Sequence, residues 1–284
     1  MDVEARFPLD KPKLALALGA IAQNDPSISA IVDTETSTTV LGADSELELD
    51  SVLAKLKQQD IAITTGRPRV AYRETITRSV TKDYTHKRHS GGKGQYARII
   101  FEIWPKARDE GNSFETRLTD DELPSNFIAG VKKGLRSVLA SGPIVGFPIV
   151  DLGMILNDSS YHGTDSSPIA FEIAARAALR EAFNSAGAVL LEPVMNVEVK
   201  LPTQYIGSII GDLNARRGQV MSITENGELN TISALVPLAN MFGYRASLNS
   251  MAAGVASFKL AYSHYQVVSL PDPDNFRPAV GMRI

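Results

Sequence analysis

The arrangement of this chain is clearest in residues 194–236, which read VMNVEVKLPTQYIGSIIGDLNARRGQVMSITENGELNTISALV. Residues 194–200 alternate apolar and polar side chains, as a half-buried strand does. Residues 205–217 then have helical spacing, and Gly218 stands where a glycine often caps a helix C-terminus. A strand followed by a helix is therefore the start of this segment.

The rest of the segment adds a hairpin, a second helix and a last strand. Residues 220–224 and 229–236 flank Asn226-Gly227, a dipeptide typical of tight β-hairpins. Residues 240–251 have helical spacing, and residues 256–262 read as a strand. The order is β-α-β-β-α-β, which is the ferredoxin-like arrangement.

The same order occurs at the start of the chain. The pattern predicts strands at 3–7, 28–32, 38–41 and 61–64, and helices at 14–21 and 47–56. A polar turn at 34–37 joins two of the strands, and Asp44 or Ser45 is a candidate N-cap for the second helix. The two ends of the chain therefore share a predicted topology, with little identity between them.

The middle of the chain has a different pattern. It predicts strands at 75–81, 96–104 and 147–156, helices at 124–140 and 168–183, and a polar loop at 83–94. Ser167 is a candidate N-cap, with Pro168 at the first helical position. The segment reads as an α/β sandwich with two long loops on one side. We therefore expect an α+β chain of three domains, at residues 1–69, 70–189 and 190–284.

Composition excludes several classes of protein. The 284 residues are 44% hydrophobic and 21% charged, which is ordinary for a globular chain. The chain has no cysteine, which excludes disulfides and thiolate chemistry and fits a reducing, cytoplasmic setting. No stretch is apolar enough for a membrane span or a secretory signal.

Charge is unevenly distributed. The chain has a net charge of −3, yet residues 72–98 hold seven lysines and arginines against two acidic residues. A local basic stretch on an acidic protein indicates a directed contact with a polyanion.

The candidate catalytic motifs lack the residue spacing that their chemistry requires. Gly91-Gly92-Lys93 lacks the glycine and the Ser or Thr that a phosphate-binding loop needs around its lysine. His162, Asp165 and a nearby serine have the residue types of a hydrolytic triad, but triads are assembled across a fold rather than within six residues. The close histidine pair, His86 and His89, lies among cations that disfavour a metal ion.

Two loops have the chemistry of RNA contact. Gly91, Gly92 and Gly94 allow close approach of the backbone, and Lys93 adds charge. The second loop, 160–167, combines rings, hydroxyl groups and the N-terminus of a helix. From residue types alone, a solvated hairpin and a well-capped helix remain the alternative.

Six stretches, in order along the chain, resemble translational elongation factor G. They are GRPRVAYRET (66–75), HSGGKGQY (89–96), SYHGTDSS (160–167), LLEPVM (190–195), GDLNARRG (211–218) and VPLANMFGY (236–244). The resemblance implies the third, fourth and fifth domains of that family, with two ferredoxin-like domains flanking a sandwich that contains a left-handed βαβ crossover. It also implies that the GTPase domain, with its GTP and magnesium, lies N-terminal to these segments. We therefore expect no cofactor and no catalysis in this chain alone, and Met1 to begin a truncated form.

The resemblance also implies partners and contact residues. The family's tip loops enter the decoding region of the small ribosomal subunit beside tRNA and mRNA, and its fifth domain contacts the GTPase-associated region of the large subunit. We expect a monomer that binds no membrane. The contact residues implied are Lys87, Arg88, Ser90, Gly91, Gly92, Lys93, Gly94, Gln95, Tyr161, His162, Asp165, Ser166, Arg216 and Arg217.

Two positions depart from the family pattern. Glu48 stands where the family usually has a histidine, and Gly163-Thr164 replaces an acidic and a small apolar residue. The function implied is promotion of translocation. The alternatives are a divergent relative that acts in ribosome recycling or ribosome protection, and an independent enzyme. For Arg216 and Arg217, the alternative to RNA contact is stabilisation of a helix end.

Overall fold

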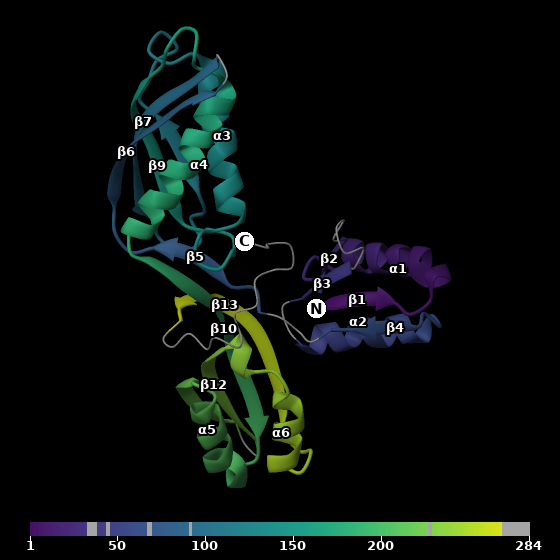
Figure 1. The fold of residues 1–284 in the computed structure, drawn as a ribbon. Coiled ribbons are helices and arrows are strands. Elements are labelled where there is room, and N and C mark those ends of the chain that lie inside the picture. Colours follow the sequence, from purple (N-terminus) through teal and green to yellow (C-terminus); the bar gives the residue numbers. More distant parts are fainter. Residues whose placement is uncertain (33–38, 44–45, 67–69, 91–92, 227–228, 269–284) are drawn as a thin grey trace. The chain divides into compact units, whose positions relative to one another are not determined.

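The computed structural model describes residues 1–32, 39–43, 46–66, 70–90, 93–226 and 229–268. The chain forms two compact units. Figure 1 shows its helices and strands in colours that follow the sequence. Unit 1 comprises the described residues of 1–70 and 193–264, and unit 2 comprises those of 71–192 and 265–268. The fold class is α+β, as predicted, with helices packed on several sheets.

The first ferredoxin-like fold lies in residues 1–70. Its elements are β1 (Asp2–Ala5), η1 (Pro8–Asp10), α1 (Lys11–Asn24), β2 (Ser29–Val32), β3 (Thr39–Gly42), α2 (Glu46–Gln58) and β4 (Ile63–Thr65). The strand order is β2-β3-β1-β4, and both helices contribute leucines to one buried core. The turn predicted at 34–37 and the N-cap candidates Asp44 and Ser45 lie outside the described residues.

The second ferredoxin-like fold repeats this order. Its elements are β10 (Ala188–Leu201), η2 (Thr203–Tyr205), α5 (Ile206–Ala215), β11 (Gln219–Asn226), β12 (Leu229–Pro237), η3 (Leu238–Asn240), α6 (Tyr244–Met251) and β13 (Ser257–Val267). The strand order β11-β12-β10-β13 corresponds to that of the first copy. The predicted repeat of topology is confirmed.

The end of helix α5 differs from the prediction in one residue. The left-handed position is Arg217, with φ of 63°, rather than Gly218. The N–H of Arg217 donates to the carbonyl of Asn214 at 3.0 Å, and that of Gly218 to the carbonyl of Leu213 at 2.8 Å. This is the Schellman pattern. Gly218 is required for another reason: a Cβ there would lie 2.6 Å from the Leu213 carbonyl oxygen.

Unit 2 is a four-stranded sheet covered on one face by two helices (Figure 1). Its elements are β5 (Arg73–Ile76), β6 (Val80–Ser90), β7 (Lys93–Pro105), β8 (Ser113–Thr116), α3 (Ser125–Ala140), β9 (Leu152–Ser160) and α4 (Pro168–Ser185). Strand β5 is not part of this sheet and pairs antiparallel with the start of β10, from Ile76↔Ala188 to Arg73↔Leu191. The order is β6-β7-β9-β8, and β8 pairs with β9 in parallel. Helix α3 connects these two strands, so β8, α3 and β9 form a βαβ unit. That the crossover of this unit is left-handed stays a prediction.

The predicted polar loop at 83–94 was wrong. Most of it is strand, because β6 and β7 pair from Val80↔Ile103 to Ser90↔Lys93 as one long hairpin. Alternate side chains of β6, such as Lys82, Tyr84 and His86, are half-buried, while their neighbours are exposed. The alternation was hidden because polar side chains occupy the half-buried positions.

Two predicted strands also have different bounds. The strand predicted at 75–81 is interrupted because Thr77 and Arg78 donate backbone N–H groups to the carbonyl of Ala186. The strand predicted at 147–156 starts only at Leu152, because Ile149 donates to the carbonyl of Leu139 and Val150 to that of Glu74. The backbone before Leu152 is therefore committed to partners outside the sheet.

A buried carboxylate holds the turn that follows α3. Glu74 on β5 is fully buried, and its carboxylate accepts backbone N–H groups from four consecutive residues, 144–147, at 2.9–3.1 Å. A Cβ at Gly142 would collide with this carboxylate. A buried charge is tolerated because several donors surround it.

Helices α3 and α4 approach each other closely at two glycines. A Cβ at Gly130 would collide with the Pro168 carbonyl, and one at Gly134 with the Glu172 carbonyl. Across this contact the Lys133 amine lies 2.9 Å from the Glu172 carboxylate and lowers its pKa, with a smaller effect from Arg176. None of the described helices combines the length and apolarity needed to cross a bilayer.

Candidate RNA interface

Two segments that are distant in the sequence form one surface in unit 2. We call it the tip, and it comprises residues 94–96 of β7 and residues 160–167 before α4. The N–H of Tyr96 donates to the carbonyl of Asp165 at 2.9 Å, and the hydroxyl of Ser166 donates to the carbonyl of Tyr96 at 2.6 Å. A Cβ at Gly94 would lie 2.5 Å from the Asp165 carboxyl carbon. The predicted candidates Gly94, Asp165 and Ser166 therefore lie together.

The loop 160–167 is also fixed internally. The N–H of His162 donates to the Ser166 hydroxyl at 2.8 Å, and the N–H of Ser166 donates to the His162 carbonyl at 3.0 Å. The hydroxyl of Thr164 lies 3.1 Å from His162 Nδ1 and donates to Asp165 Oδ1 at 3.3 Å. The His162 side chain is still 63% exposed. It is therefore oriented and available to a partner.

Aromatic packing supports the same loop. Tyr161 is 43% exposed, and its ring lies 5.5 Å from that of Phe127, which stacks on Phe171 at 4.9 Å. The Ser167 hydroxyl accepts the N–H of Ala170 at 3.2 Å, so the predicted N-cap is confirmed. The Tyr161 ring is thus supported from below by packed aromatic rings and partly exposed above, which suits stacking on an RNA base.

We expect Ser166→Ala to lower the free energy of unfolding of unit 2 by about 1–2 kcal/mol, because the change leaves two partners of the hydroxyl unpaired. Urea unfolding followed by emission of the single tryptophan, Trp104, measures this, since Trp104 lies in unit 2. Hydrogen exchange at the His162 amide should accelerate as well. Ser160→Ala, which removes only the hydroxyl contact with Tyr96, is the control and should cost less. Equal costs for the two variants would contradict a tie through Ser166.

The remaining candidate residues of the β6–β7 hairpin differ in whether the structure shows a partner for them. Gln95 Oε1 lies 3.0 Å from His86 Nε2, so this amide oxygen already has a partner. Lys87 and Arg88 are exposed, and neither forms an ion pair with any residue that the structure describes. Ser90 and Lys93 pair across the strand ends, while Gly91 and Gly92 lie outside the described residues.

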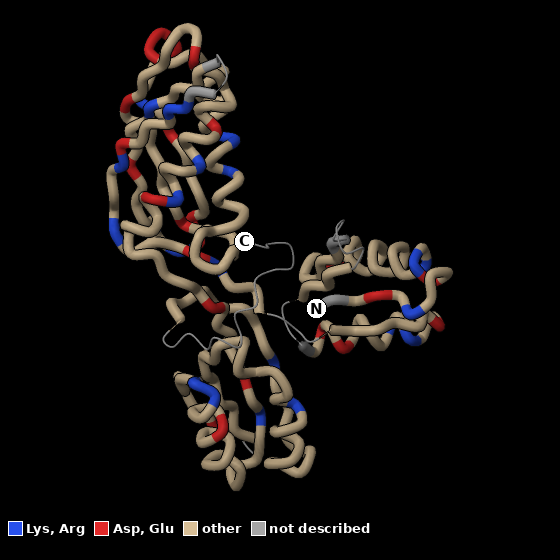
Figure 2. Tube along the Cα trace, in the orientation of Figure 1, with Lys and Arg blue, Asp and Glu red and all other residues tan. Residues whose placement is uncertain are grey.

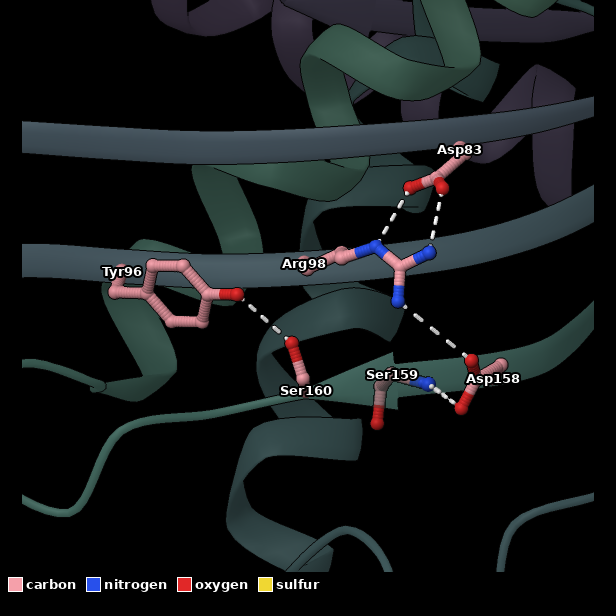
Figure 3. A network of polar contacts seen from close by, with 6 residues as sticks. All are labelled: Asp83, Tyr96, Arg98, Asp158, Ser159 and Ser160. Atoms are coloured by element: carbon pink, nitrogen blue, oxygen red, sulfur yellow. Dashed lines mark hydrogen bonds and ion pairs between the residues drawn. The ribbon is translucent and has the colours of Figure 1, made fainter.

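A polar network behind the tip was not found from the sequence (Figure 3). Arg98 donates through Nε and a terminal nitrogen to Asp83, at 3.0 and 2.6 Å, and lies 3.7 Å from Asp158. These bonds to Asp83 raise the pKa of Arg98 above its ordinary value. Tyr96 Oη lies 2.9 Å from Ser160 Oγ. The network joins β6, β7 and β9 on the sheet face opposite to the helices.

This network changes the interpretation of the basic stretch. Arg98 is neutralised by Asp83, and the Lys82 amine lies 2.5 Å from Glu181. Arg78 donates to the carbonyl of Ser185. Figure 2 accordingly shows basic and acidic residues interleaved along this unit. Among the cations of the stretch whose side chains the structure describes, Lys87 and Arg88 are exposed and have no such partner.

Arg216 and Arg217 lie in the second ferredoxin-like fold. The Arg216 guanidinium donates to Asp212, to the carbonyl of Asn240 and to Ser247, at 2.7–2.9 Å, and lies 5.1 Å above the Tyr244 ring. It therefore holds α5 and α6 together, which favours the stabilising alternative for this residue. Arg217 is exposed beside it. RNA contact at either residue stays a prediction.

Three family models together match residues 1–187 and 189–275. The model for elongation factor G domain III matches residues 1–67, that for domain IV residues 68–187, and that for the elongation factor G C-terminus residues 189–275. The two tip segments both fall within the domain IV match.

Full-length relatives give the same result. Elongation factor G from Paracoccus denitrificans and from Cereibacter sphaeroides are each 46% identical over 94% of this chain, and that from Ruegeria pomeroyi is 45% identical. The chain spans 38% of the length of these relatives. A crystal structure of ttk003000868 from Thermus thermophilus matches with a TM-score of 0.72 and 30% identity, over 94% of this chain and 40% of that one. The chain therefore belongs to the elongation factor G family and carries its domain III, domain IV and C-terminal regions.

Proposed function

We propose that this chain is the ribosome-binding portion of a translation elongation factor, and that its tip contacts RNA in the decoding region while tRNA and mRNA advance. The observation that supports this most is the joining of residues 94–96 to residues 160–167 into one fixed surface. That surface presents an oriented histidine and a supported tyrosine, and the adjoining hairpin adds the exposed cations Lys87 and Arg88. Single-stranded and looped RNA is recognised by this mixture of rings, hydrogen bonds and charge.

The role proposed is mechanical. GTP, with magnesium, would bind and be hydrolysed in a GTPase domain of the full-length protein, and the resulting change would reorient the segments described here. The tip would then hold the tRNA–mRNA complex in its advanced position. A tip suited to this must be rigid, and its hydrogen bonds to the β7 backbone provide that rigidity.

We expect His162→Ala combined with Arg88→Ala to weaken binding of this chain to vacant ribosomes by about tenfold at low salt, because a stacking ring and a phosphate contact are lost together. The slope of log affinity against log salt should fall by about one. Sedimentation with purified ribosomes and separate subunits over a salt series measures both quantities.

Arg180→Ala is the matched control, since Arg180 is an exposed arginine of α4 outside the tip. It should bind like the unmodified chain. If all three proteins bind ribosomes equally, the tip is not the contact surface. If none binds, the test should be repeated with a GTPase domain from a relative fused to residue 1.

One feature favours a second candidate function, which is ribosome recycling or protection by a divergent relative. Thr164 departs from the family pattern, and its hydroxyl lies between His162 and Asp165. Thr164→Val in the fused protein separates the two functions. Loss of translocation rate with unchanged subunit splitting supports the translocase, and the reverse supports recycling.

A further inference from the structure

Unit 2 contains a hollow on the side of α3 that faces β8, away from the tip. Its volume is about 270 Å³, which is enough for one flat group rather than a large ligand. Its lining comes from residues 112–114, from one side of α3 and from Met154 of β9.

The hollow has an apolar floor and an aromatic wall. Leu135 and Met154 are almost fully buried, at 2% and 1% exposure, and Leu139 is half-buried beside them. Phe114 on β8 forms the wall, in register with Met154 on β9. Asn112 is held by its amide, which donates to the carbonyl of Ile149 at 2.7 Å and accepts the N–H of Leu152 at 3.0 Å. The hollow is therefore a fixed feature of the fold.

The rim of the hollow is cationic. Lys132 and Arg136 are exposed and one helical turn apart, so both extend along the same side of α3. The Lys132 amine lies 5.9 Å from the centre of the Phe114 ring. Neither cation forms an ion pair with a residue in the described ranges, and the lining residues include no acid. Glu115 points to the opposite face of β8, because neighbouring strand residues alternate.

We propose that this hollow binds a nucleotide of single-stranded RNA. The base would lie against the Phe114 ring and Leu139, directly above the almost fully buried Leu135 and Met154. The adjoining phosphates would contact Lys132 and Arg136. Single-stranded nucleic acids are bound by this pairing of an aromatic surface with a cationic path for the backbone. An acidic peptide would satisfy the cations, but it would not use the aromatic wall.

The proposal goes beyond the function assigned to the tip, because it adds a second RNA-binding surface to unit 2. It can be tested without ribosomes. The full chain, labelled with ¹³C at its seven methionine methyl groups, is titrated with oligoadenylate of about ten nucleotides. The Met154 methyl resonance should shift, because that side chain forms part of the floor. The fit of this shift gives the affinity.

Two double variants separate the hollow from general electrostatics. Lys132→Ala with Arg136→Ala should weaken the affinity at the Met154 probe by about tenfold. Lys133→Ala with Arg180→Ala removes one lysine from α3 and one arginine from α4, neither of which lines the hollow. This variant should change the affinity at the Met154 probe by less than about twofold. Phe114→Leu keeps apolar volume but removes the ring, and should weaken binding several-fold while the melting temperature stays within a few degrees.

Three results would overturn the proposal. The Met154 resonance could stay unmoved at saturating RNA, or both double variants could weaken binding equally. A decaglutamate peptide could also shift Met154 as strongly as RNA does, which would identify an acidic-peptide site. The tip variant with His162→Ala and Arg88→Ala should retain the Met154 shift, so failure of the tip proposal and failure of this one are distinguishable.

Discussion

Replacing Glu74 with alanine should lower the free energy of unfolding of unit 2 by about 3–5 kcal/mol. The carboxylate is fully buried and accepts four backbone N–H groups, from residues 144–147. Without the carboxylate, either these N–H groups stay buried with no acceptor, or the turn opens so that water can reach them. Urea unfolding followed by Trp104 emission measures the change.

Glu74→Gln separates shape from charge. One oxygen of Glu74 accepts three N–H groups and the other accepts that of Ile144 at 3.0 Å, so an amide nitrogen at either position would oppose a donor. We therefore expect an intermediate loss, of about 2 kcal/mol. Glu115→Ala on β8 is the control, because Glu115 is exposed, and should cost less than about 0.5 kcal/mol. If Glu74→Ala costs no more than this control, the turn is held by other contacts.

Replacing Gly134 with alanine should destabilise unit 2 by about 1–3 kcal/mol, even though alanine is the better helix former by about 1 kcal/mol. A Cβ there would collide with the backbone carbonyl of Glu172 and lie 3.1 Å from the Ala175 methyl carbon. A backbone oxygen cannot rotate away, so α3 and α4 must separate. Gly134→Leu should cost more, or prevent folding. Trp104 emission again reports the unit concerned.

The matched control is Gly211→Ala in α5, where a Cβ would meet nothing within 4 Å. The same substitution should there raise the free energy of unfolding by up to about 1 kcal/mol, as measured by far-ultraviolet circular dichroism. The two changes should thus have opposite signs. A stabilised Gly134→Ala variant would show that the helices can move apart without cost.

The candidate site was predictable in part because its chemistry resides in short stretches. His162, Tyr161 and Ser166 could be singled out from residue types and from the family resemblance. The roles of Arg98 and Arg216 could not. Arg98 lies in the basic stretch and Arg216 beside a second arginine, and only the tertiary structure shows that Asp83 binds the first. The carbonyl of Asn240 and the hydroxyl of Ser247 bind the second. Sequence charge counts include such paired residues, so they overstate the charge available to a partner.

The sequence by itself determined the elements with a strong local period. The two β-α-β-β-α-β folds follow from the spacing of apolar residues. The N-cap at Ser167 is a contact between one hydroxyl group and a backbone N–H three residues later. These features depend on interactions close in the chain, which a pattern records directly. The elements missed were those with weak local signals: the polar hairpin β6–β7 and the four-residue strand β8.

Only the tertiary structure decided which distant groups meet. The Tyr96 backbone binds Asp165 and Ser166, the Glu74 carboxylate binds residues 144–147, and the two glycines of α3 lie against carbonyls of α4. Each contact joins segments separated by about 38 to 73 residues, and each satisfies or excludes a particular atom. Which atoms meet in this way depends on how whole helices and strands pack together. The periodicity of a single sequence does not record that packing.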